Sequence, residues 1–316
     1  MMDGPFIPGD DFVLFAGTAN PALAEAVARE LGVPLGGCRI EHFPDGELSV
    51  RLLESVRRKE VYVIQPTAPP VNDMLVELLA FADACRRSAA ARVTAVVPYF
   101  GYARADRRRR REPITASMVA ALMQTAGIDH VLSVDLHTPQ IEGFFQIPVD
   151  SLSAVGPICD ALAGTLPADL AVVSPDAGRV KSATEFAHRL GAPLAIIMKR
   201  RESGTHTEVT HLVGEVRGRA CLIVDDMIST GGTLVSSIHA LREAGAREFY
   251  IAATHGLLVG DACERLQEAG VTRVVVTDTV RVPQREWSAL RVVSLAPLLA
   301  EAIRRMVHRE SVSEMG

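Results

Sequence analysis

Short apolar runs alternate with amphipathic stretches along most of this chain, and that alternation constrains its fold more than any other feature. The first cycle starts at the strand-like run "FVLFA", Phe12–Ala16. Asn20 and Pro21 then supply an N-cap and a first-turn proline for a helix that ends before Gly32. The same order of strand, turn and helix recurs in residues 61–87, 93–127, 170–191, 220–245 and 249–270. In the first three of these we expect helices at Met74–Arg87, Thr115–Ala126 and Ala177–Leu190. We therefore expect an α/β fold, with mostly parallel sheets covered by helices on both faces.

The length of 316 residues predicts two domains, because a typical domain has about 150 residues. A candidate crossover lies in "FFQIPVDSLSAVGP", where Ser, Gly and Pro follow a strand-like end before a new helical pattern begins. We place the first domain at residues 8–153 and the second at residues 154–293. The segments "VLSVDLH" and "YIAATH" are each a strand ending in histidine, and this weak similarity leaves an internal duplication open.

The composition is that of an ordinary globular protein, with 48% hydrophobic residues, 22% charged residues and a formal net charge of −5. This balance argues against nucleic acid or a membrane surface as a partner, so any basic site is local. The N-terminal "MMDGPFIPGDDF" lacks a signal pattern, and no apolar run reaches the roughly 18 residues of a membrane span, so we expect a cytoplasmic protein. The five cysteines form no CxxC pair, and we interpret them as buried free thiols.

The most specific motif is "ACLIVDDMISTGGTL", in which we expect a strand at Ala220–Val224 followed by Asp225 and Asp226. A loop then enters a helix through Ser229, Thr230, Gly231, Gly232 and Thr233. Glycines let backbone N–H groups approach an anion, and a helix start carries partial positive charge, so the loop predicts a phosphate site. The carboxylates would accept hydrogen bonds from hydroxyls, which indicates a polyol phosphate such as ribose 5-phosphate. A solvated, N-capped turn would explain the loop but not the aspartate pair.

This stretch resembles the phosphoribosyl diphosphate loop of type I phosphoribosyltransferases and of phosphoribosyl diphosphate synthetases. Other segments favour the synthetases, also called ribose-phosphate pyrophosphokinases. They are "HFPDGELSVRL", "VVPYFGYARADR", "PITASMVAALMQTAG", "VLSVDLHTPQIEGFF" and, near the C-terminus, "EAIRRM". The resemblance runs from about Phe12 to Met306, whereas a nucleobase transferase would share only the loop.

The resemblance implies two type I phosphoribosyltransferase-like domains, with a C-terminal helix at about residues 294–310 packing on the first. It implies transfer of the diphosphoryl group of Mg-ATP to the C1 hydroxyl of ribose 5-phosphate, with release of AMP. It also implies a homo-oligomer, either a hexamer, a tetramer or a dimer, in which two ATP-binding segments meet between subunits.

These two segments are "FPDGE" and "RADR". Phe43 offers a flat face to adenine, and Arg104 stacks on the base or reaches the phosphates. The implied ATP contacts are Phe43, Asp45, Gly46, Glu47, Arg104, Ala105 and Asp106. Ala105 stands where the family usually has glutamine or lysine, which leaves a backbone contact at that position. Taken alone, "PDGE" would be interpreted as a plain turn.

Five consecutive arginines, Arg107–Arg111, follow the second segment. Taken alone they would fit a nucleic-acid patch or a solvated loop. They lie between a strand and a helix in an acidic chain, so we interpret them as a local phosphate-binding feature. In the resembling family this basic loop contributes to nucleotide or phosphate effector sites.

By the same resemblance, His137 and Asp176 align with positions that bind a divalent cation, and Asp135 lies nearby. Mg²⁺ suits this set because it keeps most of its waters and takes few protein ligands. A single histidine after a strand is otherwise more often a satisfied polar residue. Arg179 stands where the family usually has a second glycine, so it either alters the backbone around Asp176 or adds a phosphate contact.

We expect a polar loop at Met198–Glu208, "MKRRESGTHTE", after a strand at Pro193–Ile197. It resembles the family's mobile catalytic loop, on which Lys199 and Arg201 close over the transferring group. Cations on such a loop neutralise charge on the phosphoryl oxygens. Without the resemblance, these residues would be interpreted as an ordinary surface loop.

Three functional hypotheses stay open from the sequence. An active synthetase is supported by the joint presence of all the site segments. A non-catalytic regulatory paralogue, which binds nucleotide or a synthetase subunit, is supported by departures at Ala105, Arg179 and Ser229; many relatives have aspartate at the last position and some have serine. A nucleobase phosphoribosyltransferase is disfavoured by the ATP-site segments.

Overall fold

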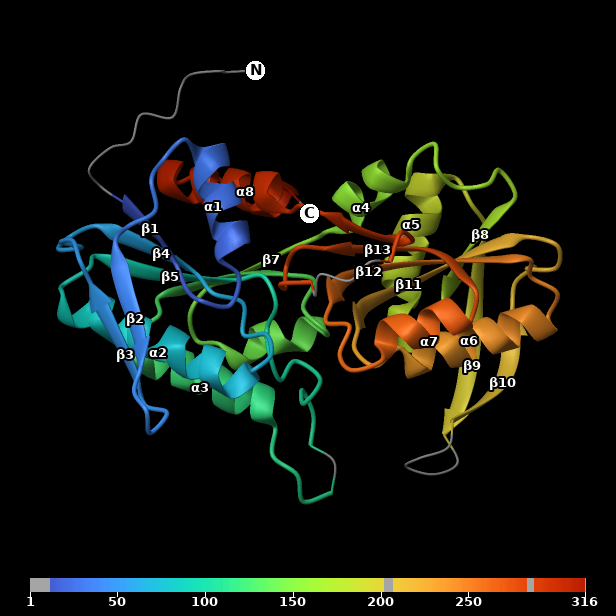
Figure 1. Cartoon of the computed structure of the whole chain (residues 1–316), viewed down its shortest axis with the longest axis horizontal. Helices are drawn as coiled ribbons and strands as arrows, with labels where there is room; N and C mark the ends of the chain where they lie inside the picture. Colours follow the sequence, from blue (N-terminus) through green and yellow to red (C-terminus); the bar gives the residue numbers. More distant parts are fainter. Residues whose placement is uncertain (1–11, 109, 202–206, 283–286, 316) are drawn as a thin grey trace. The chain divides into compact units, whose positions relative to one another are not determined.

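The computed structural model describes the backbone of residues 12–108, 110–201, 207–282 and 287–315 (Figure 1). The chain divides into two compact units. Unit 1 contains Met1–Ser153, Thr279–Arg281 and Ser294–Gly316, and unit 2 contains Ala154–Asp278 and Val282–Val293. The chain therefore builds most of unit 2 after Ser153, passes briefly through unit 1 at Thr279–Arg281, and returns to unit 1 from Ser294.

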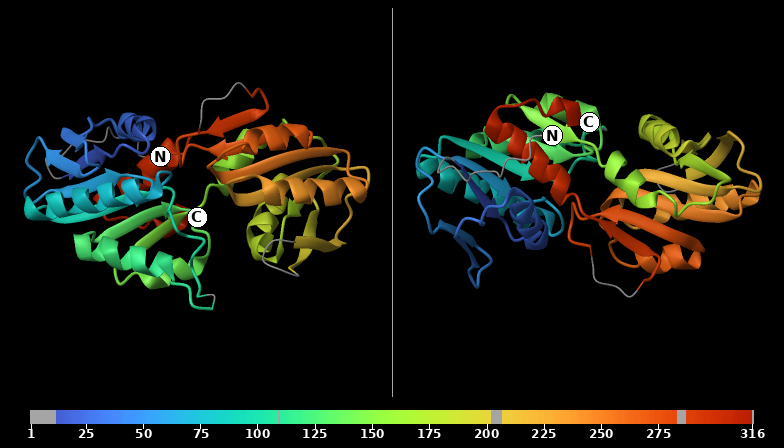
Figure 2. Two further views of the ribbon diagram at one scale, coloured as in Figure 1. Left: turned by 60° about the horizontal axis from the view of Figure 1, so that its bottom comes forward. Right: turned by 90° about the horizontal axis from the view of Figure 1, so that it is seen from above.

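Unit 1 is built on a wholly parallel sheet of five strands. In spatial order they are β1 (Phe12–Ala16), β4 (Glu60–Ile64), β5 (Arg92–Val97), β6 (His130–Val134) and β7 (Val149–Leu152). Its helices are α1 (Pro21–Leu31), α2 (Val71–Arg87), α3 (Thr115–Ala126) and α8 (Ala296–His308), with short 3-10 turns η1 (Pro139–Phe144) and η3 (Ser313–Met315). Helices α2 and α3 cover one face of the sheet, and α1 and α8 cover the other (Figures 1 and 2). An antiparallel hairpin of β2 (Cys38–His42) and β3 (Leu48–Leu52) completes the unit.

The bounds of α1 follow from its capping residues, as the sequence predicts. The Asn20 side chain accepts a hydrogen bond from the N–H of Leu23 at 3.4 Å. Gly32 ends the helix with a φ of 71°, a left-handed conformation that costs glycine little. Within unit 1, α8 packs against α1, and Arg304 donates to the carbonyl of Glu30 at 3.3 Å.

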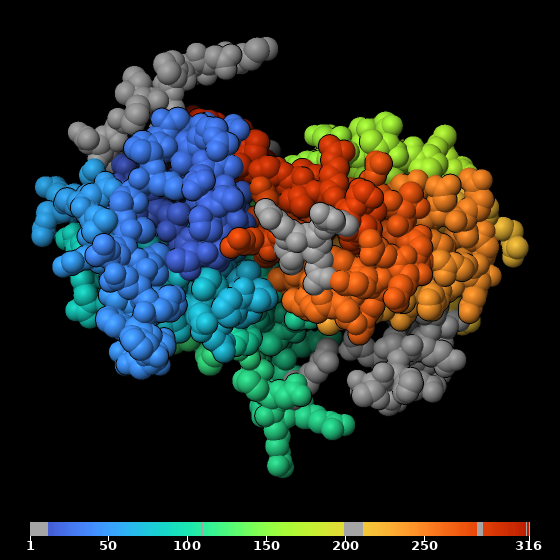
Figure 3. Space-filling view, viewed as in Figure 1, coloured from blue at the N-terminus to red at the C-terminus, as the bar shows by residue number. Residues whose placement is uncertain are grey.

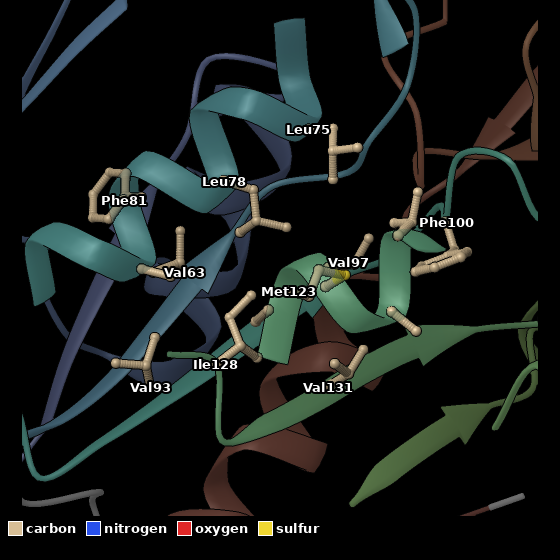
Figure 4. Close-up of a cluster of buried hydrophobic side chains, with 14 of the residues drawn as sticks. Val63, Leu75, Leu78, Phe81, Val93, Val97, Phe100, Met123, Ile128 and Val131 are labelled. Carbon is tan, nitrogen blue, oxygen red and sulfur yellow. The ribbon is translucent and has the colours of Figure 1, made fainter. Parts of the chain in front are cut away.

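The main core of unit 1 lies between the sheet and helices α2 and α3 (Figure 4). Phe81 of α2 and Met123 of α3 are fully buried in this core, together with Val63 of β4, which is 1% exposed. Burial of a large apolar side chain stabilises the fold by about 1.5–3 kcal/mol. This core fixes the strands whose carboxyl ends carry the predicted ATP and metal residues of unit 1.

Unit 2 is built on a seven-stranded sheet in which every described neighbouring pair but one is parallel. In spatial order the strands are β10 (Thr207–Val213), β9 (Leu194–Arg201), β8 (Leu170–Ser174), β11 (Ala220–Ile228), β12 (Glu248–Gly256), β13 (Val271–Thr277) and β14 (Leu290–Val293). Helices α4 (Val155–Leu162) and α5 (Val180–Leu190) cover one face, and α6 (Gly232–Glu243) and α7 (Ala262–Glu268) cover the other (Figure 1). None of the described helices is long and apolar enough to cross a membrane.

Besides β9, which is described below with the site, three elements have bounds that differ from the prediction. β11 continues to Ile228 instead of ending at Val224, because its pairing with β12 persists to that residue. The helix expected from Ala177 begins as a 3-10 turn, η2 (Ala177–Arg179), before α5. The helix expected from Met74 begins at Val71, directly after Pro70.

The five cysteines are all free thiols, four of them buried and Cys38 half-buried. Burial raises the pKa of Cys85 to about 12, so this thiol stays protonated at neutral pH. Four of the five cysteines therefore agree with the interpretation as buried free thiols, whereas Cys38 is free but only half-buried.

Candidate functional site

The carboxylate pair of unit 2 lies near the end of β11, at a strand edge where pairing with β8 has ended. β8 pairs with β11 from Ala220 to Ile223, whereas Asp225 still pairs in register with Ala253 of β12. Both carboxylates are largely buried, with side-chain exposures of 14% for Asp225 and 7% for Asp226. The N–H of Asp226 donates to Asp225 Oδ1 at 2.8 Å. The pair therefore belongs to the strand itself, not to the loop after it.

The predicted phosphate loop, Ser229–Thr233, runs from the end of β11 into the first turn of α6. Gly231 caps α6 with a φ of 75°, a left-handed value that would strain any residue with a Cβ atom. Backbone N–H groups of Leu258 and Val259 donate to the carbonyls of Ile228 and Ser229 at 2.9 and 3.1 Å, which supports the loop from behind. The first turn of an α-helix has N–H groups without intrahelical partners, so this geometry suits an anion.

Arg179, at the end of η2, contacts both carboxylates. Its Nε lies 3.3 Å from Asp225 Oδ1 and its Nη2 lies 3.0 Å from Asp226 Oδ2. Burial raises the pKa of Asp225 well above its ordinary value, the neighbouring Asp226 carboxyl adds to that rise, and the Arg179 guanidinium opposes it. Neither sequence-based interpretation of Arg179 anticipated this contact.

Asp176, the predicted metal ligand in unit 2, follows β8 and caps the turn that carries Arg179. Its Oδ1 accepts a hydrogen bond from the N–H of Gly178 at 2.8 Å. Its carbonyl accepts one from the Ser174 hydroxyl at 2.7 Å. These two bonds fix the start of η2 and hold Arg179 beside the end of β11.

In unit 1, the segment Phe43–Glu47 forms the tip of the β2–β3 hairpin. The N–H of Phe43 donates to the carbonyl of Glu47 at 2.8 Å, and Gly46 has a φ of 92°. Asp45 Oδ1 accepts from the N–H of Glu47 at 3.1 Å. The Phe43 side chain is 51% exposed, so the turn presents an aromatic face to solvent, where a base could stack.

The second predicted ATP segment, Arg104 to Asp106, lies in the loop after β5. Arg104 is exposed, whereas Ala105 and Asp106 are half-buried. The Thr138 hydroxyl donates to Asp106 Oδ2 at 2.7 Å. Because Thr138 follows His137, this bond joins the predicted nucleotide segment to a predicted metal segment within unit 1.

The described members of the arginine run, Arg107, Arg108, Arg110 and Arg111, are all exposed. Arg109 lies outside the described residues. The segment that carries them projects from unit 1 and is green in Figures 1 and 3. An effector site on this loop stays a prediction.

Asp135 and His137 follow β6 and are half-buried. Asp135 has a φ of 41°, which is uncommon for a residue other than glycine, and its N–H donates to the carbonyl of Leu152 at 2.9 Å. Such backbone conformations concentrate at functional sites. No group of three or more His, Cys, Asp or Glu residues gathers in the part of the chain that the structure describes. A magnesium site needs fewer protein ligands, because waters and substrate phosphates complete its shell.

Lys199 and Arg201 lie on a strand, so the expectation of a loop at these two positions is wrong. Their backbones pair with Val209 and Thr207 in the β9–β10 hairpin. Pairing satisfies backbone groups that a polar loop would leave to water. The two side chains, and residues 202–206, lie outside the described residues, so the catalytic roles stay predictions.

Sequence reasoning missed two contacts at the site, the Arg179 ion pairs and the Thr138–Asp106 hydrogen bond. One signal could have indicated the first. Arg179 immediately precedes α5, and a cation at a helix N-terminus is unfavourable unless a carboxylate compensates it. No local signal pointed to the second, since its partners are joined only by the fold.

The chain matches two family models. Residues 12–127 match the N-terminal domain of ribose phosphate pyrophosphokinase, and residues 204–315 match the phosphoribosyl synthetase-associated domain. A ribose-phosphate pyrophosphokinase of Caldanaerobacter subterraneus is 48% identical over 306 residues, which covers 96% of both chains. One of Neisseria meningitidis is 46% identical over 308 residues, covering 96% of this chain and 94% of the relative. The crystal structure of phosphoribosylpyrophosphate synthetase from Mycobacterium smegmatis superposes with a TM-score of 0.89 at 43% identity, covering 95% of this chain and 100% of that one.

Proposed function

The chain belongs to the ribose-phosphate pyrophosphokinase family, and we propose that it catalyses the diphosphoryl transfer of that family. The donor is Mg-ATP, the acceptor is the C1 hydroxyl of ribose 5-phosphate, and the products are phosphoribosyl diphosphate and AMP. The observation that carries this proposal is the buried carboxylate pair of β11 leading directly into a glycine-capped helix start in unit 2. Its product, phosphoribosyl diphosphate, serves nucleotide biosynthesis, and the protein acts in the cytoplasm as a homo-oligomer.

The ribose site is the end of β11 and the loop that follows it. Asp225 and Asp226 accept hydrogen bonds from the ribose hydroxyls. The loop Ser229–Thr233 binds the 5-phosphate through backbone N–H groups at the start of α6, where the helix dipole favours an anion. Ser229 donates its hydroxyl to the phosphate and adds no negative charge beside it.

The ATP site is assigned to the hairpin tip and to the loop after β5. The Phe43 ring stacks on adenine, and Asp45, Gly46 and Glu47 complete that side. Arg104, Ala105 and Asp106 contribute from the second segment, with Arg104 on the base or the phosphates. The subunits of the oligomer bring these two segments together.

Within unit 1, the proposed ligands of Mg²⁺ are Asp135 and His137. Within unit 2, the proposed ligand is Asp176. The carboxylate oxygens of the two aspartates are the hard donors that this ion prefers, whereas His137 offers an imidazole nitrogen. Each of the three residues follows a parallel strand, where ligands bind in α/β sheets. When bound, the ion neutralises negative charge on the ATP phosphates.

The reaction forms one bond and breaks one. The C1 hydroxyl oxygen attacks the β-phosphorus of ATP, and its proton passes to water. The bond from the β-phosphorus to the oxygen shared with the α-phosphate breaks, and AMP departs with the electron pair. The negative charge on the oxygens of the transferring phosphoryl group requires cations close by. We assign this role to Lys199 and Arg201.

Incubation of the pure protein with Mg-ATP and ribose 5-phosphate tests the function by chromatography of released AMP. We expect AMP and phosphoribosyl diphosphate in equal amounts. Lys199→Ala should lower kcat by about a hundredfold or more and leave ribose 5-phosphate binding nearly unchanged, as a transition-state contact does. The matched control is Lys181→Ala, on an exposed position of α5.

No AMP above background from the wild-type protein, with Mg²⁺ and phosphate present, would reject the enzyme assignment and favour a regulatory paralogue. Equal loss of turnover and of ribose 5-phosphate binding in Lys199→Ala would reject only the role of Lys199.

A further inference from the structure

Arg179 is a basic residue placed among acidic ones in the interior of unit 2. Its side chain is 15% exposed, close to the exposures of the two carboxylates that it contacts. Two buried carboxylates next to each other repel, and an unpaired buried charge is strongly unfavourable. The Arg179 guanidinium therefore supplies the positive charge that compensates the negative charge of Asp225 and Asp226.

The Arg179 side chain contacts both carboxylates because of its position in the fold. Consecutive strand residues direct their side chains to opposite faces of a sheet, so Asp225 and Asp226 are accessible together only from the strand edge. β8 leaves β11 at Ile223, and the chain then turns through η2. That turn, capped by Asp176, places Arg179 at the vacated edge of β11.

The contact is made by two different nitrogens, each on a different carboxylate. A guanidinium is a rigid planar fork, so two such contacts fix the rotation of both carboxylates, which a single point charge cannot do. We propose that Arg179 is a positioning residue of the ribose site, which sets the direction in which Asp225 and Asp226 present their oxygens to the ribose hydroxyls. This inference rests on the proposed function.

Loss of Arg179 should affect the binding of ribose 5-phosphate more than the chemical step. Ribose hydroxyls form directional hydrogen bonds, so carboxylates that rotate freely bind them less well. Arg179 is not assigned to the transferring phosphoryl group, so its loss leaves the chemical step nearly intact. Loss of a charge-assisted contact corresponds to about a tenfold to hundredfold weaker affinity.

The test compares four full-length proteins: wild type, Arg179→Ala, Arg179→Lys and the control Arg189→Ala. Arg189 lies on α5 and pairs with Glu185 at 3.2 Å on the surface. Calorimetric titration gives the Kd for ribose 5-phosphate, steady-state kinetics give KM and kcat, and thermal unfolding reports folding. We expect Arg179→Ala to raise the Kd and the KM for ribose 5-phosphate by about ten- to a hundredfold, with kcat and the KM for ATP within about threefold of wild type.

Arg179→Lys keeps the charge without the fork, so we expect it to recover only part of the affinity at a wild-type melting temperature. If Arg179→Ala fails to fold, this variant alone decides. Full recovery by lysine, an unchanged Kd, or a loss confined to kcat would overturn the inference. A tighter Kd would also overturn it, because the ion pair would then compete with the ribose. Titration requires no turnover, so an inactive wild-type protein would reject the proposed function without deciding the role of Arg179.

Discussion

Among single residues, Asp225 couples function to stability most directly. Its folded-state pKa is raised by burial and by Asp226, so the folded protein holds a proton that the unfolded chain releases above about pH 4. The stability that this proton contributes is fully present below the pKa of Asp225 in the unfolded chain. It is lost as the pH rises through the higher pKa of Asp225 in the folded protein. Asp225→Asn carries no such charge. We expect it to be more stable than the wild type at neutral pH and to lose ribose 5-phosphate affinity.

Urea unfolding at a series of pH values from 4 to 8 checks this expectation. The difference in unfolding free energy between Asp225→Asn and wild type should be smallest at the acid end and grow toward neutral pH. Asp83→Asn is the contrasting control, because Arg86 and Arg87 lower the pKa of this exposed carboxyl. That variant should gain no stability at neutral pH. If the difference in unfolding free energy between Asp225→Asn and wild type did not change with pH, the raised pKa of Asp225 would not be its cause.

At this scale, sequence reasoning succeeded where the chemistry is local. The order of Asp225, Asp226 and Gly231 along the chain is enough to indicate carboxylates beside an anion-binding helix start, and the structure has that order in space. Arg179 could be singled out from the sequence, but its ion-pair partners could not be identified, because they lie on β11, four elements further along the chain. Pairing across a sheet depends on strand order, which local patterns do not contain.

Between elements, the Thr138–Asp106 hydrogen bond is the contact whose removal is most informative. It joins the loop after β5 to the loop after β6, so it restricts both the nucleotide segment and the metal segment of unit 1. Thr138→Val removes the hydroxyl and keeps the side-chain shape. A hydrogen bond to a charged group contributes about 1.5–3 kcal/mol. In the variant, water can replace the hydroxyl as the partner of Asp106, and this recovers part of that free energy. We expect the KM for ATP to rise about fivefold while the KM for ribose 5-phosphate stays unchanged.

The control for this variant is Thr125→Val, on the exposed side of α3, where the hydroxyl donates to the carbonyl of Ala121 at 2.8 Å. It should leave both KM values unchanged. Equal increases in the KM for ATP and for ribose 5-phosphate in Thr138→Val would show a general loss of order, not a specific link between the two loops.

The alternation of apolar and amphipathic segments was sufficient to predict most of the sheet strands and helices. It failed at β9 and β11, which both extend beyond their apolar runs. Each extension has a partner strand that supplies backbone hydrogen bonds, β10 for Lys199 and Arg201 and β12 for Asp225. Polar composition predicts a loop at such positions, because composition does not reveal a neighbouring strand.

On the scale of the whole molecule, unit 1 is completed only by the last helix of the chain. The described N-terminal residues begin with β1, but α8, which packs on α1, follows the whole of unit 2. A contact between such distant segments requires closure of a long loop, which is unfavourable until many other contacts form. Deletion of a buried side chain in α8 should therefore loosen the N-terminal elements of unit 1 and leave unit 2 intact.

Ile303→Ala tests this, since Ile303 of α8 is fully buried. A large-to-small change at such a site costs about 2–5 kcal/mol. Hydrogen exchange should show lost protection in α1 and β1, with β8 and β11 of unit 2 unchanged. Leu266→Ala is the reciprocal control, because Leu266 of α7 is equally buried in the core of unit 2. It should reduce protection in unit 2 alone. Loss of protection in both units from either variant would mean that the chain unfolds as one cooperative body, so that its two cores are not independently stable.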